Sequence, residues 1–258
     1  AHTDANAFNL VAENNTKSAN TAALYTIPEG KTSLPLGSTV KDTKGNEVEL
    51  ADALKWKAGD ATADKIVLKT VEAVASVGSK QYGSLQAAID AAPAGQTVTL
   101  LTNLDLSATG LTIAKDKAVT LDLNGKTLSL GNNNPFFRTN GEVTIQNGTI
   151  DSNVACVIVN AYNKLTLKNV KITGVTGNNG KNLVNVCSNA EVTIDKDTVL
   201  TASGSNGAAV FIGQDADAKY TLNVYGKVIQ ESKSFAISGN GSYKGTTTIN
   251  IYDGAEVK

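Results

Sequence analysis

A short apolar–polar–apolar triplet recurs from about residue 97 to the end of the chain, and this repeat limits the possible folds more than any other feature. The triplets begin at residues 98, 121, 143, 165, 192, 222 and 249, which gives steps of 23, 22, 22, 27, 30 and 27 residues. A turn signal follows most triplets, as at Asn124-Gly125 and Asn147-Gly148, and another short apolar strand comes after the turn. Alternation with a period of two is typical of half-buried β-strands.

Each unit therefore offers about three short strands, the last of them a run such as Val184 and Val186 or Phe235 and Ile237. No helix-length segment separates the units, which excludes a parallel sheet built from βαβ crossovers. A β-sandwich is the nearest alternative, but it does not require such regular recurrence. The pattern favours a three-stranded coil that stacks in parallel on the next copy, with aliphatic columns inside. Right-handed winding is expected for parallel crossovers.

Three phrases resemble the right-handed parallel β-helix of the pectate-lyase-like superfamily, most closely its non-enzymatic surface-protein branch. They are YGSLQAAIDAA at 82–92, GQTVTL at 95–100 and VTLDLNGKTL at 119–128, and the likeness covers about residues 74–258. The resemblance implies an all-β solenoid of the adhesin or phage-fibre type. This fold also carries lyases and hydrolases, so it does not define a function by itself.

The repeat predicts two domains. Residues 1–72 form a tail and a small α+β module for attachment or packing, and residues 73–258 form the β-helix with a capping helix at 84–92. Ser84 is a good N-cap, and the helix carries one apolar stripe, made of Leu85, Ala88, Ile89 and Ala92. Within the first domain we expect a short helix around 48–56 and a strand at 65–71.

The C-terminus has no equivalent helix, because the chain stops at Lys258 part-way through a coil. We expect either that the native chain continues or that this end docks on a partner, which would make a homo-oligomer possible. The N-terminal domain similarly packs on the first coil or attaches the solenoid to a larger body. The residues leave both alternatives open.

The charge balance excludes several classes of partner. There are 23 basic and 24 acidic residues, for a net charge of -1, which argues against nucleic acid, and no apolar run is long enough for membrane insertion. Two cysteines and one histidine are too few for a zinc site. The acidic pairs Asp195/Asp197 and Asp215/Asp217 supply too few oxygens for calcium. We predict no metal and no cofactor.

Residues for catalysis are sparse. If the chain were a lyase, the resemblance would imply an Arg or Lys base with calcium. If it were a hydrolase, the resemblance would imply an adjacent Asp pair and a histidine. The only arginine here is Arg138, the only histidine is His2, and no Asp-Asp pair occurs. Arg138 is therefore either an anion-binding residue or a surface charge beside Phe136 and Phe137. The sequence favours a non-enzymatic protein but leaves a lyase or hydrolase as an alternative.

Two tyrosines are the best candidates for ligand contact. Tyr225 and Tyr252 each follow an inward residue, so both face outward, and they lie 27 residues apart, one coil. Stacked rings on a flat sheet suit either a sugar-binding platform or a structural pair between coils. The turn residues Asn147 and Asn169 fall at equivalent positions and are predicted to stack for structural reasons.

The cysteines provide a test of the strand register. Counting back from the next strand places Val159 over Val186, which separates Cys156 from Cys187 by four positions, or about 13 Å. A disulfide requires Cα atoms within about 7 Å, so we predict two thiols.

Three functions remain. The first is a non-enzymatic extracellular or cell-surface module, or alternatively a virion fibre, that presents a polar face to glycans or to a surface protein. The second is a polysaccharide lyase or hydrolase with a dispersed site. The third is a structural subunit assembled through the C-terminal end.

Overall fold

The structure of the chain is a computed structural model. It describes residues 8–12, 33–35, 39–41, 47–49, 65–70, 73–106, 110–131, 137–155, 157–177, 181–213, 218–241 and 245–258. The chain divides into two compact units, Ala1–Ala88 and Ile89–Lys258. The predicted domain boundary after residue 72 stays a prediction. Within the described residues no helix is long and apolar enough to cross a membrane.

The described part of the first unit contains short antiparallel strands. β5 (Lys65–Thr70) lies between β1 (Phe8–Ala12) and β2 (Ser33–Pro35). β3 (Thr39–Lys41) pairs with β4 (Glu47–Glu49), and β6 (Ala75–Val77) pairs with β7 (Lys80–Tyr82).

One expectation for this unit is corrected and one is confirmed. The start of the expected helix around 48–56 is strand, because Val48 lies opposite Val40 in the β3–β4 pair, where two β-branched side chains favour extended backbone. Residues 50–56 lie outside the described residues. The expected strand at 65–71 is confirmed as β5 over residues 65–70.

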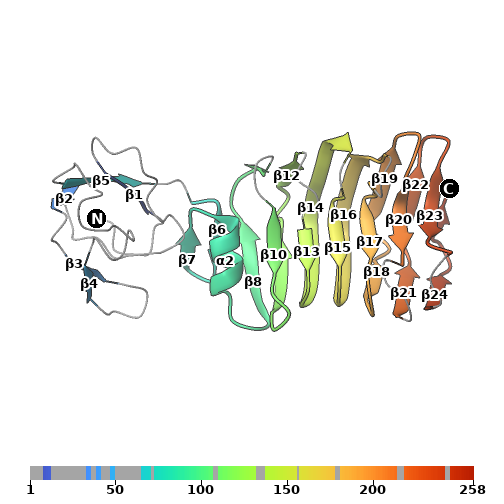
Figure 1. The fold of residues 1–258 in the computed structure, drawn as a ribbon, viewed down its shortest axis with the longest axis horizontal. Helices are drawn as coiled ribbons and strands as arrows, with labels where there is room; N and C mark the ends of the chain where they lie inside the picture. Colours follow the sequence, from blue (N-terminus) through green and yellow to red (C-terminus); the bar gives the residue numbers. More distant parts are fainter. Residues whose placement is uncertain are drawn as a thin grey trace. The chain divides into compact units, whose positions relative to one another are not determined.

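The second unit is a parallel β-solenoid of about five turns, as expected from the repeat (Figure 1). Each strand pair in it is parallel, and the strands form two layers. One layer is a six-stranded sheet of order β10-β13-β15-β17-β20-β23. The other, which we call the larger sheet, runs β24-β21-β18-β16-β14-β11-β8, with β9, β12, β19, β22 and β25 paired alongside.

The strands of this unit have the following bounds: β8 (Gln96–Leu100), β9 (Leu104–Asp105), β10 (Leu111–Ile113), β11 (Ala118–Asp122), β12 (Thr127–Leu130), β13 (Phe137–Thr139), β14 (Glu142–Ala155), β15 (Val159–Ala161), β16 (Lys164–Val175), β17 (Val184–Val186), β18 (Glu191–Ile194), β19 (Val199–Ser203), β20 (Ala208–Ile212), β21 (Lys219–Val224), β22 (Lys227–Gln230), β23 (Phe235–Gly239), β24 (Thr246–Ile251) and β25 (Glu256–Val257).

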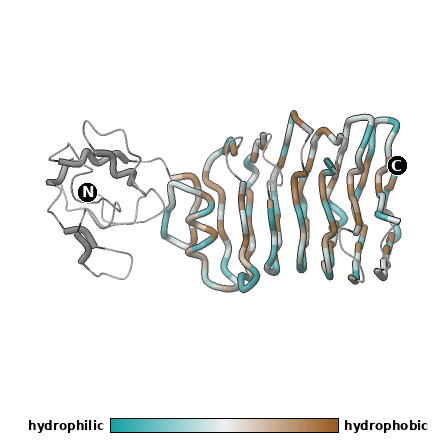
Figure 2. The backbone as a smooth tube through the Cα atoms, in the orientation of Figure 1, coloured by the Kyte–Doolittle hydropathy of each residue, from teal (hydrophilic) through white to brown (hydrophobic). Residues whose placement is uncertain are grey.

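The core consists of aliphatic columns that run from coil to coil. In one column six paired residues are each 0% exposed, namely Val98, Leu121, Ile145, Leu167, Ile194 and Val224. Hydrophobic and hydrophilic residues alternate along every coil of the tube (Figure 2). A single coil has no second layer to cover its apolar side, so stacking on the neighbours stabilises each coil.

The register departs from our alignment at two places. Leu121 pairs with Ile145, not with Val143, so one step is 24 residues where we expected 22. Both 119–121 and 121–123 satisfy the alternation, and a period of two cannot distinguish registers that differ by two residues.

The second correction concerns Val159, which pairs with Val184 and not with Val186. The turn after β17 is two residues longer than the turn after β15, and counting back from the next strand does not detect this difference. The cysteine separation derived from that register is therefore wrong. Cys156 lies outside the described residues, so the prediction of two thiols stays a prediction. Cys187 is buried, and its Sγ lies 3.8 Å from the carbonyl oxygen of Asn185.

Asparagines form the turns of the larger sheet, as predicted for Asn147 and Asn169. These two residues have φ angles of 58° and 51°, in the left-handed region that Asn tolerates better than most residues. Asn169 Nδ2 donates to Asn147 Oδ1 at 3.2 Å, and Asn147 Nδ2 donates to Asp122 Oδ2 at 3.1 Å. The ladder fixes the coil-to-coil alignment at this edge.

The predicted capping helix is α2 (Leu85–Ala91). Ser84 caps it, because Ser84 Oγ accepts a hydrogen bond from the Ala87 amide at 3.1 Å. All four residues of the predicted stripe are buried. Lys117 Nζ donates to the carbonyl oxygens of Asp90 and Ala92 at 2.7 and 2.9 Å, which joins the C-terminal end of the helix to the turn before β11.

Candidate functional site

Tyr225 and Tyr252 form the stacked outward pair that their spacing predicted. Backbone hydrogen bonds from Tyr225 N to Ile194 O and from Tyr252 N to Val224 O, both 2.9 Å, place the two residues in successive coils. Their ring centroids lie 3.9 Å apart with an interplanar angle of 7°, and the residues are 38% and 39% exposed. Each ring covers one face of the other, so the pair presents ring edges and hydroxyl groups between the coils.

The tyrosine hydroxyls interact with each other. The pKa of Tyr225 is raised, mainly by its side-chain hydrogen bond to Tyr252, and further by desolvation and by the charge that Tyr252 carries when ionised. Tyr225 is therefore neutral at physiological pH, and its hydroxyl group can donate a hydrogen bond.

A charged cluster joins β22 to the C-terminal end of the chain, with Lys227 on β22, Glu256 on β25 and Lys258 after β25. Glu256 accepts hydrogen bonds from Lys258 and Lys227, with nitrogen–oxygen distances of 2.5 and 3.1 Å. These two ammonium groups lower the pKa of Glu256. All three side chains are at least about one-third exposed, so solvent screens the ion pairs and their contribution to stability is small.

A row of hydroxyl and carboxamide side chains leads along the larger sheet beside the tyrosine pair. One half-buried residue per coil belongs to this row, which we call the polar row. Its members pair with one another from strand to strand and are Thr97, Thr120, Thr144, Thr166, Thr193, Asn223 and Asn250.

Hydrogen bonds connect the last members of the polar row. Asn250 Nδ2 donates to Asn223 Oδ1 at 2.8 Å. Asn223 Nδ2 in turn lies 3.3 Å from Glu191 Oε1 and 3.4 Å from Thr193 Oγ1. The neighbouring strands lie about 4.8 Å apart, so like groups repeat at that interval. The sequence predicted a polar outer face, but only the strand register shows which residues form one row.

Arg138 lies on strand β13, not in the loop-like stretch that the sequence suggested. Its guanidinium carbon lies 5.2 Å from the centroid of the Tyr162 ring, within the range of a cation–π contact. Phe137 is fully buried, and Phe136 lies outside the described residues. The outer face of the six-stranded sheet therefore carries Arg138, whereas Tyr225 and Tyr252 follow strands of the larger sheet. The structure does not bring the three candidate residues together.

Carboxylates do not form a cluster in the described part of the chain. Asp195 and Asp197 follow β18 in a turn, where Asp195 Oδ1 accepts a hydrogen bond from the Asp197 amide at 3.2 Å. The Asp215/Asp217 pair lies outside the described residues. No group of three or more His, Cys, Asp or Glu side chains suited to a metal ion occurs among the described residues.

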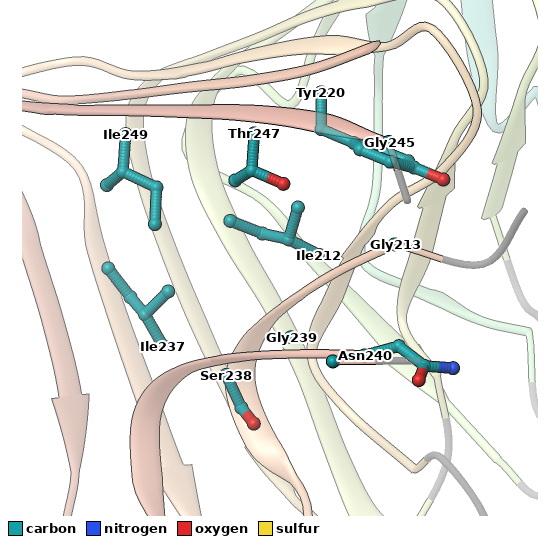
Figure 3. A pocket seen from close by; sticks show the side chains of 11 residues that line it. Ile212, Gly213, Tyr220, Ile237, Ser238, Gly239, Asn240, Gly245, Thr247 and Ile249 are labelled. Carbon is teal, nitrogen blue, oxygen red and sulfur yellow. The ribbon is translucent and has the colours of Figure 1, made fainter. Parts of the chain in front are cut away.

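The last coil encloses a cavity of about 450 Å³ between the two layers. Figure 3 shows Ile249 and Thr247 of β24 on one side and Ile212 and Ile237 opposite them. Ile249 and Ile251 are 44% and 57% exposed, although their counterparts in the preceding coil, Leu222 and Val224, are 0% exposed. This cavity is the apolar interior of the solenoid, open at its last coil.

Comparison of the chain with protein-family models, with curated proteins and with solved structures found no match. The chain is thus defined as a parallel β-solenoid protein by its own strands and register.

Proposed function

We propose that this chain is a non-enzymatic display or adhesion module of the pectate-lyase-like type, located outside the cell, on the cell surface or on a virion. In this proposal the outer face of the larger sheet binds an extended glycan, with a surface protein as the alternative partner. The observation that carries the proposal is the polar row, one hydroxyl or carboxamide per coil, which runs beside the Tyr225–Tyr252 pair.

A periodic row suits a periodic ligand. A polymer that lies parallel to the solenoid axis meets a similar donor or acceptor at each coil, about every 4.8 Å. Each such hydrogen bond contributes only about 0.5–1.5 kcal/mol, so useful affinity requires several of them at once. Binding is then expected to strengthen as the glycan chain lengthens, which a single pocket for one sugar does not produce.

The test is a binding survey of residues 1–258 against immobilised glycans of graded length. Thr193→Ala and Tyr252→Ala should each weaken binding of the longer glycans, by roughly threefold to tenfold. Thr112→Ala is the matched control, because Thr112 is an outward threonine of the six-stranded sheet. Equal loss in all three variants, or affinity that does not depend on glycan length, contradicts the proposal. Retention of a protein in place of any glycan assigns the face to the protein partner.

Assembly is a second candidate function, and the open last coil favours it. Ile249 and Ile251 expose apolar surface on β24, which pairs with a single strand, β21, among the described strands. An exposed strand edge with apolar side chains is a template for pairing with a further strand. We propose a second copy of the chain as the occupant.

A further inference from the structure

A hollow of about 380 Å³ lies on the side of the six-stranded sheet, and we call it the outer hollow. Its volume falls within the range of ligand pockets, about 300–1,000 Å³. Phe211 and Ser238, which are paired outward neighbours on β20 and β23, line one part of it. The remaining lining comes from Phe235 and from residues between strands, namely Gly177, Asn182, Ser205, Asn206, Gly207, Ala208, Lys233 and Ser234.

The loops around the outer hollow are fixed to one another. Gly204 N donates to Ser232 Oγ at 2.9 Å, and Ser234 Oγ donates to the carbonyl oxygen of Gly207. Gly207 has a φ of 85°, and a Cβ atom there would lie 2.3 Å from the carbonyl oxygen of Lys181, so three loops meet closely at this glycine. A hollow that is already formed does not lose ordering entropy when a ligand enters.

The floor of the hollow is also rigid. Asn182 is 1% exposed, its Nδ2 donates to Asn185 Oδ1 at 3.0 Å, and its Oδ1 accepts a hydrogen bond from the Ala208 amide at 2.8 Å. These bonds hold the Ala208 end of β20 in place beside Phe211 and Phe235. The two phenylalanines are therefore presented by a fixed backbone.

The lining combines an open aromatic ring with small polar groups. Phe235 is 68% exposed, the largest exposed fraction among the large hydrophobic residues of the described chain. Asn206, Ser205 and Ser238 add carboxamide and hydroxyl groups around it. Lys233 is the only charged residue of the described lining, and it is exposed, so solvent screens its charge.

This chemistry matches a pyranose ring. Such a ring has an apolar C–H face that an aromatic ring can cover, and hydroxyl groups at its edge that need hydrogen-bond partners when they leave water. We infer that the outer hollow is a second, separate binding site, which takes a single uncharged sugar ring stacked on Phe235. It lies on the other sheet from the polar row, and it does not depend on the proposed function.

Ligand-observed saturation-transfer NMR on the full chain tests this inference. The probes are the methyl glycosides of glucose, galactose, mannose and N-acetylglucosamine, with methyl glucuronoside as the charged comparison. We expect transfer to the C–H protons of at least one neutral glycoside. Phe235→Ala should lower its affinity at least fivefold, and Phe235→Tyr should retain binding because the aromatic face remains.

Thr112→Ala is the control, because Thr112 is an exposed residue of β10, at the opposite edge of the six-stranded sheet from β23, and its loss should leave glycoside binding unchanged. Thermal melts of the variants establish that each is folded. The inference is overturned if no glycoside binds, if only the glucuronoside binds, or if Phe235→Ala and Thr112→Ala bind the glycoside equally well. Loss of long-glycan binding in Tyr252→Ala with glycoside binding intact would support both sites separately.

Discussion

At several positions of the solenoid a neighbouring backbone comes so close that a residue larger than glycine does not fit. Gly226 is the clearest case. It follows Tyr225 in the turn between β21 and β22, and a Cβ atom at this position would lie 2.3 Å from the carbonyl oxygens of both Asp195 and Thr198. Real Cβ atoms do not come so close to backbone oxygens, so any larger residue must push the two turns apart. The same turn positions the tyrosine pair.

Gly226→Ala should therefore destabilise the solenoid by roughly 1–3 kcal/mol, the usual cost of forcing an extra methyl group into a packed site. Gly241→Ala is the control, because a Cβ atom at Gly241 has no atom within 4 Å. Chemical denaturation of both variants measures the difference. Equal stability of the two would show that the turn adjusts without cost.

At the scale of the element, a buried asparagine network holds strands β15 and β17 and the segment before β17 together. Asn185 Nδ2 donates to Asn160 Oδ1 at 2.8 Å, and Asn185 Oδ1 accepts from Asn182 Nδ2 at 3.0 Å. The three residues are 7% exposed or less. The sequence shows only that Asn185 alternates with Val184 and Val186, which is typical of a solvent-facing polar residue. In the structure Asn185 is 1% exposed, so that interpretation does not hold.

Asn185→Ala should cost on the order of 3 kcal/mol, because two buried polar atoms each lose a hydrogen-bond partner. Asn250→Ala removes a comparable side-chain bond, to Asn223, at a part-buried position. Water can replace that partner, so the loss there should stay below about 1.5 kcal/mol. Urea unfolding of the two variants checks the order, and an equal or reversed order would contradict the role of burial.

At the scale of the whole molecule, the solenoid is a stack in which the strands of each coil pair with those of the adjacent coils. Stability of such a protein is close to a sum over coils and over the interfaces between them. Six members of one inward column are fully buried, whereas the seventh, Ile251, is 57% exposed. In the second candidate function, assembly of two copies, this coil forms the contact with the second copy.

Light scattering of the chain over a range of concentrations should show association, and Ile251→Asp should abolish it by placing a charge on the apolar edge. Thr248→Asp is the control, because Thr248 is a polar residue of the same strand. A monomer at every concentration would reject assembly through this coil. Loss of association in both variants would indicate a general effect of charge on β24.

The fold follows from the sequence because two signals are local. Alternation in segments such as 143–145 defines half-buried strands, and their recurrence without intervening helices permits little except a stacked coil. The stack of Tyr225 on Tyr252 was predictable for the same reason, since both residues directly follow strands whose register the repeat defines. The predicted register was wrong where turn lengths differ between coils, as the pairing of Val159 with Val184 shows.

The sequence by itself determined the parallel solenoid, the capping helix, the asparagine turns and the outward tyrosine pair, because each depends on a period or a signal within a few residues. Only the tertiary structure decided which polar residues form one row, that Asn185 is buried, and that Phe235, grouped by sequence with the apolar strand residues, is exposed beside Phe211. The polar row depends on a strand register that the turn lengths set. The burial of Asn185 and the exposure of Phe235 depend on segments about one coil apart in sequence that meet in space, and no local pattern encodes the distance between them.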